Sequence, residues 1–121
     1  MTRTRVVVTG LGTVSAAGTD LDQFWTWVCD APPAPVSTPV DDFDPRRWLT
    51  AKEVRRSDPF ARYAVAASRL ALADADLAPE SVSPTRSGVI LGTVYGALES
   101  FDAEAAVMAA DAESLARVDG I

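Results

Sequence analysis

Short apolar runs alternate with amphipathic stretches along the chain, and they predict two strands. The first run, Val6–Val8, is β-branched and stops at the glycine segment Gly10–Gly12. The second run, Gly88–Gly92, reads Gly-Val-Ile-Leu-Gly. Runs that are apolar at every position are typical of buried strands in a parallel sheet covered on both faces. The glycines after the first run predict a tight turn between strand and helix.

Apolar positions that recur with a helical period predict a first helix soon after this turn. Thr19 or Asp20 is placed to cap it, and an acidic or amide residue three positions later completes a capping-box pattern. The helix is expected to run to about Cys29. Its apolar face consists of Leu21, Phe24, Trp25, Val28 and Cys29.

The longest helical pattern covers Pro59–Leu77, and Asp58 precedes it as a predicted N-cap. Small and apolar residues surround most of the circumference of this helix. A surface helix keeps a full polar stripe, so this composition is typical of a helix buried inside a larger protein. A final helix is predicted from Leu98 to about Val118.

Residues 30–50 form a proline-rich connection between the first two helices. Four prolines lie between Asp30 and Val40. They remove backbone donors and favour extended backbone in the residues before them, which excludes a helix or an inner strand. The irregular stretch that follows has three candidate hydrophobic anchors, Phe43, Trp48 and Leu49.

The predicted order is therefore strand, helix, loop, helix, strand, helix, and we expect an α/β fold in a single domain over residues 1–121. Two strands are too few for an independently stable sheet. The parallel or mixed sheet is predicted to be incomplete and to need further strands. A continuation of the chain or a partner is expected to supply them.

Charge and hydropathy narrow the classes of partner. The net charge is −6. Residues 63–121 account for all of it, with three basic and nine acidic side chains. An acidic chain is a poor nucleic-acid binder, because neutralising phosphate supplies most of that affinity. No apolar run approaches the ~20 residues that cross a bilayer, and no signal peptide is apparent, so we expect a cytoplasmic protein without a membrane partner.

The residue types that carry much enzyme chemistry are missing. The chain has no histidine and one cysteine, which excludes a Ser-His-Asp or Cys-His site, a structural zinc site and a disulfide framework within these residues. Cys29 is predicted beside Asp30 at a helix C-terminus, where a thiolate is disfavoured, and a packing role is expected instead. The acidic stretch 41–44 lacks the alternation of a calcium loop and predicts a capped turn.

The glycine segment has two interpretations, a phosphate cradle and a structural turn. The dinucleotide fingerprint requires G-x-G-x-x-G before a helix, but Gly10 and Gly12 are followed by a glycine only at Gly18. No Gly-Lys-Ser/Thr motif occurs either. We therefore favour the structural turn and expect no nucleotide or metal cofactor.

Three segments together resemble the N-terminal part of the β-ketoacyl-acyl carrier protein synthases. They are Val6–Gly18, Lys52–Ala67 and Gly88–Gly96, and their order and spacing agree with that family. Ala16 departs from it, because the family's turn often carries proline there. The resemblance implies a partial thiolase-like layered fold and a decarboxylative condensation of an acyl thioester with malonyl-carrier. The family's cysteine nucleophile and two histidines lie beyond the region that this chain resembles, which implies that no residue here is catalytic.

The resemblance also implies two binding roles. Lys52, Arg55 and Arg56 match positions that present positive charge to the acidic acyl carrier protein. The residues alone favour a solvated basic face with ion pairs to Glu53 and Asp58. Tyr95 matches a position that gates the acyl pocket, where a tyrosine narrows the pocket. An aromatic side chain packed at a dimer contact is the other interpretation of this position.

The leading hypothesis is an N-terminal segment of a ketosynthase from fatty-acid or polyketide biosynthesis, inactive alone. Its expected partners are acyl carrier protein and the remaining part of a ketosynthase or a second synthase subunit, in an enzyme that is typically a dimer. The alternative is a non-catalytic module that binds a carrier protein or a synthase. A small nucleotide-binding α/β protein is a third, weaker hypothesis.

Overall fold

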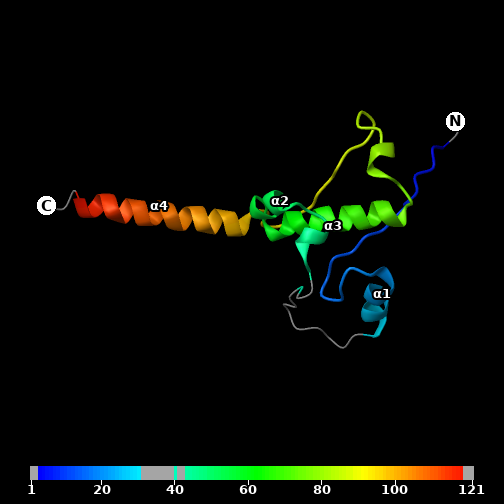
Figure 1. Cartoon of the computed structure of the whole chain (residues 1–121), viewed down its shortest axis with the longest axis horizontal. Helices are drawn as coiled ribbons and strands as arrows, with labels where there is room; N and C mark the ends of the chain where they lie inside the picture. Colours follow the sequence, from blue (N-terminus) through cyan, green and yellow to red (C-terminus); the bar gives the residue numbers. More distant parts are fainter. Residues whose placement is uncertain (1–2, 31–39, 41–42, 119–121) are drawn as a thin grey trace.

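The computed structural model describes residues 3–30, 40 and 43–118, with side chains up to residue 110. Four α-helices are present, with two short 3₁₀ turns, η1 and η2, between them (Figure 1). The α-helices are α1 (Leu21–Asp30), α2 (Ala51–Arg55), α3 (Pro59–Asp74) and α4 (Leu98–Val118). The turns are η1 (Pro45–Arg47) and η2 (Pro79–Ser81). Most of the proline-rich connection, residues 31–39 and 41–42, lies outside the described residues.

All three predicted helices are confirmed as α1, α3 and α4. At the start of α1, the carboxylate of Asp20 accepts a hydrogen bond from the backbone N–H of Gln23 at 2.8 Å, so Asp20 rather than Thr19 is the cap. Helix α3 ends three residues earlier than expected. Asp76 takes a left-handed conformation (φ 53°), which stops the helix, and the N–H of Leu77 closes it onto the carbonyl of Leu72 at 2.9 Å.

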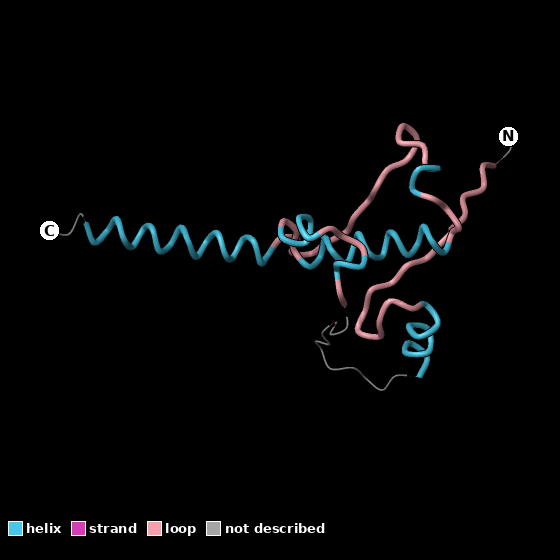
Figure 2. Tube along the Cα trace, in the orientation of Figure 1, coloured by secondary structure: helices cyan, strands magenta, loops and turns pink. Residues whose placement is uncertain are grey.

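The two predicted strands do not pair in the described part of the chain. Residues 5–9 and 88–92 run without regular strand pairing and are drawn as loops in Figure 2. Their apolar side chains face solvent, with Val89 92% and Ile90 101% exposed. A strand needs a neighbouring strand for its backbone hydrogen bonds. Among the described residues, neither segment has such a neighbour. The sheet, and with it the predicted α/β order, stays a prediction.

The tight turn is real, but it lies beyond the glycines predicted to form it. Ser15 and Gly18 exchange two backbone hydrogen bonds, at 3.0 and 2.9 Å, and Gly18 has a positive φ of 100°. Residues 10–12 form no turn, so the prediction of a turn at Gly10 and Gly12 is wrong. The glycines have another role, which is close contact with a helix.

Gly10 and Gly12 let the N-terminal segment touch the backbone of α3. A Cβ atom on Gly10 would lie 2.2 Å from the carbonyl oxygen of Ala71, and one on Gly12 would lie 2.1 Å from that of Ala67. Ala67, Ala71 and Ala75 are spaced four residues apart and form one small-residue face of α3. Between the glycines, the N–H of Leu11 donates to the carboxylate of Asp74 at 2.9 Å. Only glycine allows an approach this close.

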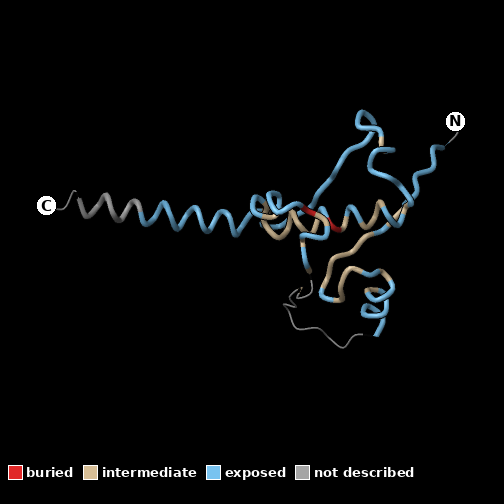
Figure 3. The backbone as a smooth tube through the Cα atoms, viewed as in Figure 1, coloured by how far each residue is buried: buried red, intermediate tan, exposed pale blue. Residues whose placement is uncertain are grey.

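The buried core of the described residues is small. Leu49 and Ala66 are the two buried apolar residues, both near the junction of η1, α2 and α3 (Figure 3). The expected anchors are confirmed, since Phe43 stacks on Trp48 with ring centroids 5.3 Å apart, and Leu49 is buried. Helix α4 extends away from the other elements, and Phe101, Val107 and Met108 on it are mostly exposed. The composition of α3 predicted a helix buried inside a larger protein. The other described residues bury only Ala66 of this helix.

Substituting Gly12 by alanine is expected to detach the N-terminal segment from α3, because the added Cβ would overlap the Ala67 carbonyl. Overpacking of this kind costs about 1–3 kcal/mol. The amide of Leu11 should lose hydrogen-exchange protection, which NMR measures. Gly92→Ala is the matched control, since nothing lies within 4 Å of its Cβ position. Equal protection of Leu11 in the two variants would show that the contact is not tight.

Candidate functional site

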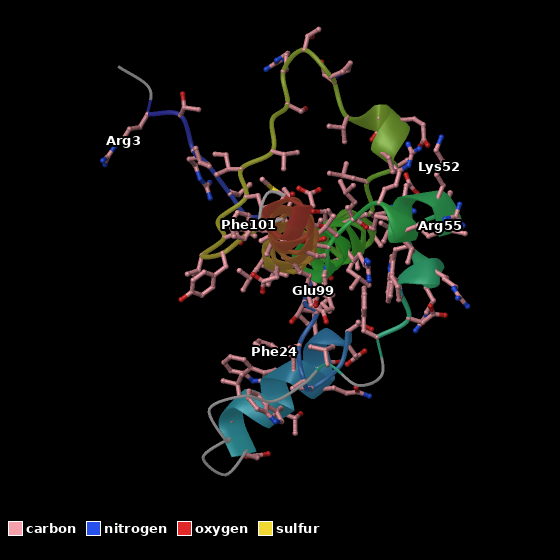
Figure 4. The ribbon with its side chains drawn as sticks, turned by 90° about the vertical axis from the view of Figure 1, so that its left-hand side faces the viewer. Arg3, Phe24, Lys52, Arg55, Glu99 and Phe101 are labelled. Carbon is pink, nitrogen blue, oxygen red and sulfur yellow. The ribbon has the colours of Figure 1, made fainter. Side chains whose placement is uncertain are left out.

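The basic face of α2, defined as Lys52, Arg55 and Arg56, is the candidate site. These residues have the spacing that places side chains on one face of a helix, and all three are exposed. Figure 4 shows Lys52 and Arg55 pointing from α2 into solvent. The structure therefore brings the three predicted docking residues together as one cationic surface.

A capping box determines where α2 begins. The hydroxyl oxygen of Thr50 accepts from the Glu53 N–H at 3.3 Å, and the Glu53 carboxylate accepts from the Thr50 N–H at 2.7 Å. Two N–H groups that the helix leaves unpaired are thus satisfied. A 3₁₀ turn precedes it, in which the Asp44 carboxylate accepts from the Arg46 N–H at 3.0 Å. The short α2 is therefore specified locally.

Hydrogen bonds from Thr50, first the backbone one, lower the pKa of Glu53 below its ordinary value of 4.5. The pKa of Glu53 is lower in the folded chain than in the unfolded one. The capping box therefore stabilises the fold fully above pH 4.5, and this stabilisation is lost as the pH falls through the lowered pKa. At neutral pH the carboxylate is ionised and the box is intact.

An aromatic cluster attaches this region to α3. Phe43 lies between Trp48, on which it stacks, and Tyr63 of α3, which it meets edge-on at a centroid distance of 4.9 Å. Such pairs add roughly 0.5–1.5 kcal/mol beyond their buried area. The Arg47 guanidinium lies 5.1 Å from the centre of the Trp48 ring. The cluster thus attaches the segment that leads into α2 to helix α3.

The two carboxylates expected to pair with the basic face are engaged elsewhere. Glu53 belongs to the capping box, and Asp58 accepts hydrogen bonds from Ser100. Asp58 is the N-cap residue of α3, as predicted, but its side chain makes no cap hydrogen bond to that helix. The nearby Arg62 donates to the backbone oxygen and the hydroxyl of Ser57, which makes it structural. Within the described part of the chain, neither of these carboxylates neutralises the basic face.

Tyr95 lies in the turn that leads into α4. Gly96 has a positive φ of 57°, and its N–H donates to the hydroxyl of Thr93 at 3.0 Å. The side chain of Tyr95 is 77% exposed, so the described residues do not form an acyl pocket around it.

The hollow beside Gly12 is unsuited to phosphate. It has a volume of about 390 Å³, and its lining includes three carboxylates. These belong to Asp20, Asp22 and Asp74, and the last already accepts from Leu11. An anion bound here would have three carboxylates of like charge in the lining. This lining disfavours the interpretation of the glycine segment as a phosphate cradle.

Cys29 is exposed, so the packing role expected for it is not found within the described residues. Over the same residues, no group of three or more His, Cys, Asp or Glu side chains is arranged to hold a metal ion. None of the described helices is long and apolar enough to cross a membrane.

Two long-range contacts were not predictable from the sequence. Leu11 and Asp74 are 63 positions apart, and Asp58 and Ser100 are 42 apart. No periodicity or motif links residues at such distances. The repeat of alanines at Ala67, Ala71 and Ala75 was a usable signal, because a small-residue face invites close approach of another backbone.

The family described as "Beta-ketoacyl synthase, N-terminal domain" matches residues 34–118. The 3-oxoacyl-[acyl-carrier-protein] synthase 2 of Rhizobium meliloti is 35% identical over 117 aligned residues, covering 78% of this chain and 28% of that protein. The synthase 2 of Synechocystis sp. is 30% identical, covering 86% of this chain and 28% of its own length. A β-ketoacyl synthase 1 of Streptomyces violaceoruber, named for the granaticin polyketide, is 32% identical, and the alignment covers 89% of this chain and 29% of that protein. No solved structure matches.

Proposed function

Because the chain belongs to the β-ketoacyl synthase N-terminal domain family, we propose that it supplies the N-terminal part of such a synthase and does not catalyse condensation alone. It spans 28% or 29% of the length of the curated relatives compared above. Membership implies a thiolase-like fold. The proposed reaction is the decarboxylative condensation of an acyl thioester with malonyl-carrier, in a cytoplasmic enzyme of fatty-acid or polyketide biosynthesis.

The observation that carries this proposal is the apolar surface left without cover. Val6, Val8, Val89 and Ile90 in the two predicted strands are mostly exposed, as are Phe101 and Met108 of α4. Apolar surface on this scale marks a surface that another segment covers. We propose that further strands pair with residues 5–9 and 88–92 and complete the sheet in the assembled synthase.

The chemistry of the reaction supports the proposal that this chain does not catalyse condensation alone. Condensation requires a nucleophile for the acyl group and donors that stabilise the developing oxyanion. The chain has no histidine, and its one cysteine lies in the last turn of α1 next to Asp30. A carboxylate and a helix C-terminus both disfavour a thiolate.

Complementation tests the proposed function. The chain is mixed with a second chain that carries the downstream part of the Rhizobium meliloti relative, and carbon dioxide release from malonyl-carrier is measured. We expect no turnover from either chain alone and turnover from the mixture.

A downstream chain without its cysteine nucleophile is the control and should bind without turnover. Binding without turnover by the intact downstream chain would favour the non-catalytic binding module instead. Turnover by the 121-residue chain alone would contradict the proposal.

We further propose that the basic face of α2 docks acyl carrier protein. Its three cationic groups share one exposed surface, and the carboxylates closest in sequence are occupied by Thr50 and Ser100. An acidic carrier would be steered to such a surface, and the attraction would weaken with salt.

Reversing the three charges, as Lys52→Glu, Arg55→Glu and Arg56→Glu together, is expected to weaken carrier binding by about 3-fold to 150-fold, since each exposed pair contributes roughly 0.2–1 kcal/mol. Fluorescence anisotropy of labelled carrier at two salt concentrations measures this. The matched control reverses Arg3, Arg5 and Arg86, which are also exposed and change the net charge equally. An equal loss in both triple variants would show that net charge alone is responsible.

Tyr95 is proposed as the gate of the acyl pocket, with the side chain limiting chain length. In the complemented synthase, Tyr95→Gly is expected to shift products to longer acyl chains, which mass spectrometry of the carrier-bound products detects. Val94→Ala, at an exposed neighbouring position, is the control. Unchanged product length with weakened dimer formation would assign Tyr95 to a dimer contact.

A further inference from the structure

Asp58 connects the first turns of two helices. It is the residue before α3, yet its carboxylate makes no cap bond to that helix. One carboxylate oxygen instead accepts from the backbone N–H of Ser100 at 3.2 Å, and the other accepts from the Ser100 hydroxyl. Ser100 is the third residue of α4. A single side chain therefore links the start of α3 to the start of α4.

The electrostatics of this contact are favourable. The first four N–H groups of a helix have no partner within it, and together with the helix dipole they attract negative charge. Asp58 stands at the N-terminus of α3 and bonds one such N–H of α4. Hydrogen bonds to an ionised carboxylate are stronger than bonds between neutral groups.

Each residue of the contact is close in sequence to one of the two proposed binding features. Arg56, at the end of the basic face, is two residues before Asp58, and Tyr95 is five residues before Ser100. In Figure 4, Glu99 and Phe101, the neighbours of Ser100, are labelled at α4, and Lys52 and Arg55 are labelled on α2 to the right of it. Among the described residues, α4 makes few other contacts, and its side chains face solvent.

We infer that Asp58 and Ser100 form a joint that sets the position of Tyr95 relative to the basic face of α2. Both are positioning residues, and they act through the backbone of α4 without touching substrate. The role in acyl-chain selection rests on the proposed function of Tyr95. The carrier that docks on α2 would then deliver its acyl group to a gate held at a fixed place.

Distances between two spin labels test the joint in this chain. Labels at Ala51 of α2 and Ala103 of α4, introduced as cysteines in a Cys29→Ser background, should give one narrow distance distribution. Asp58→Ala is expected to broaden it, because α4 loses its link. Ser100→Ala should have a smaller effect, since the backbone N–H of residue 100 still donates to Asp58.

Asp102→Ala is the matched control, because Asp102 is an exposed carboxylate on the same helix. Circular dichroism should report equal helix content in all variants, which separates a moved helix from an unfolded one. A distribution that stays as narrow in Asp58→Ala as in Asp102→Ala would overturn the joint.

The complemented synthase separates this inference from the proposed function. Asp58→Ala is expected to give a mixture of product lengths where the parent gives one, and Tyr95→Gly is expected to give longer products. If Tyr95→Gly lengthens the products and Asp58→Ala leaves them unchanged, the joint has no role in selection and the gate stands. If Tyr95→Gly changes nothing, the gate proposal falls, while the label distances still decide whether the joint exists.

Discussion

The contact between the N-terminal segment and α3 is the constraint on which the arrangement of the described residues depends. Gly10 and Gly12 place their backbone directly against the carbonyls of Ala71 and Ala67, and Asp74 holds the segment through Leu11. This contact determines where the chain enters the turn at Ser15–Gly18 and hence where α1 begins. Little of it is hydrophobic burial. It depends on the absence of side chains, which makes it intolerant of any substitution that adds volume.

The helices were predictable because their causes are local. Apolar period, caps and prolines identified α1, α3 and α4, and the anchors Phe43, Trp48 and Leu49 were recognised from composition alone. The small helix α2 was missed, although Thr50 and Glu53 have the spacing of a capping box. The two strands have a different cause, because a strand forms only when a neighbouring strand pairs with its backbone. In the described residues no such neighbour is present.

The candidate site divides in the same way. Lys52, Arg55 and Arg56 were singled out from the sequence, but their shared face was not predicted, because it depends on the missed helix α2. The partner of Asp58 was not predictable, because a carboxylate before a helix is equally suited to capping that helix or another one. Likewise, the glycines looked like a turn in sequence, and only the approach of α3 explains them. Long-range contacts of this kind have no local signature.

The bond from Leu11 to Asp74 also has a consequence for biosynthesis. The two residues are 63 positions apart, so at about 5–20 residues per second the ribosome needs roughly 3 to 13 seconds to deliver Asp74 after Leu11. Throughout that interval Gly10 and Gly12 have no complete α3 to contact. The segment that is made first therefore reaches its final contact only once the whole of α3 has been synthesised.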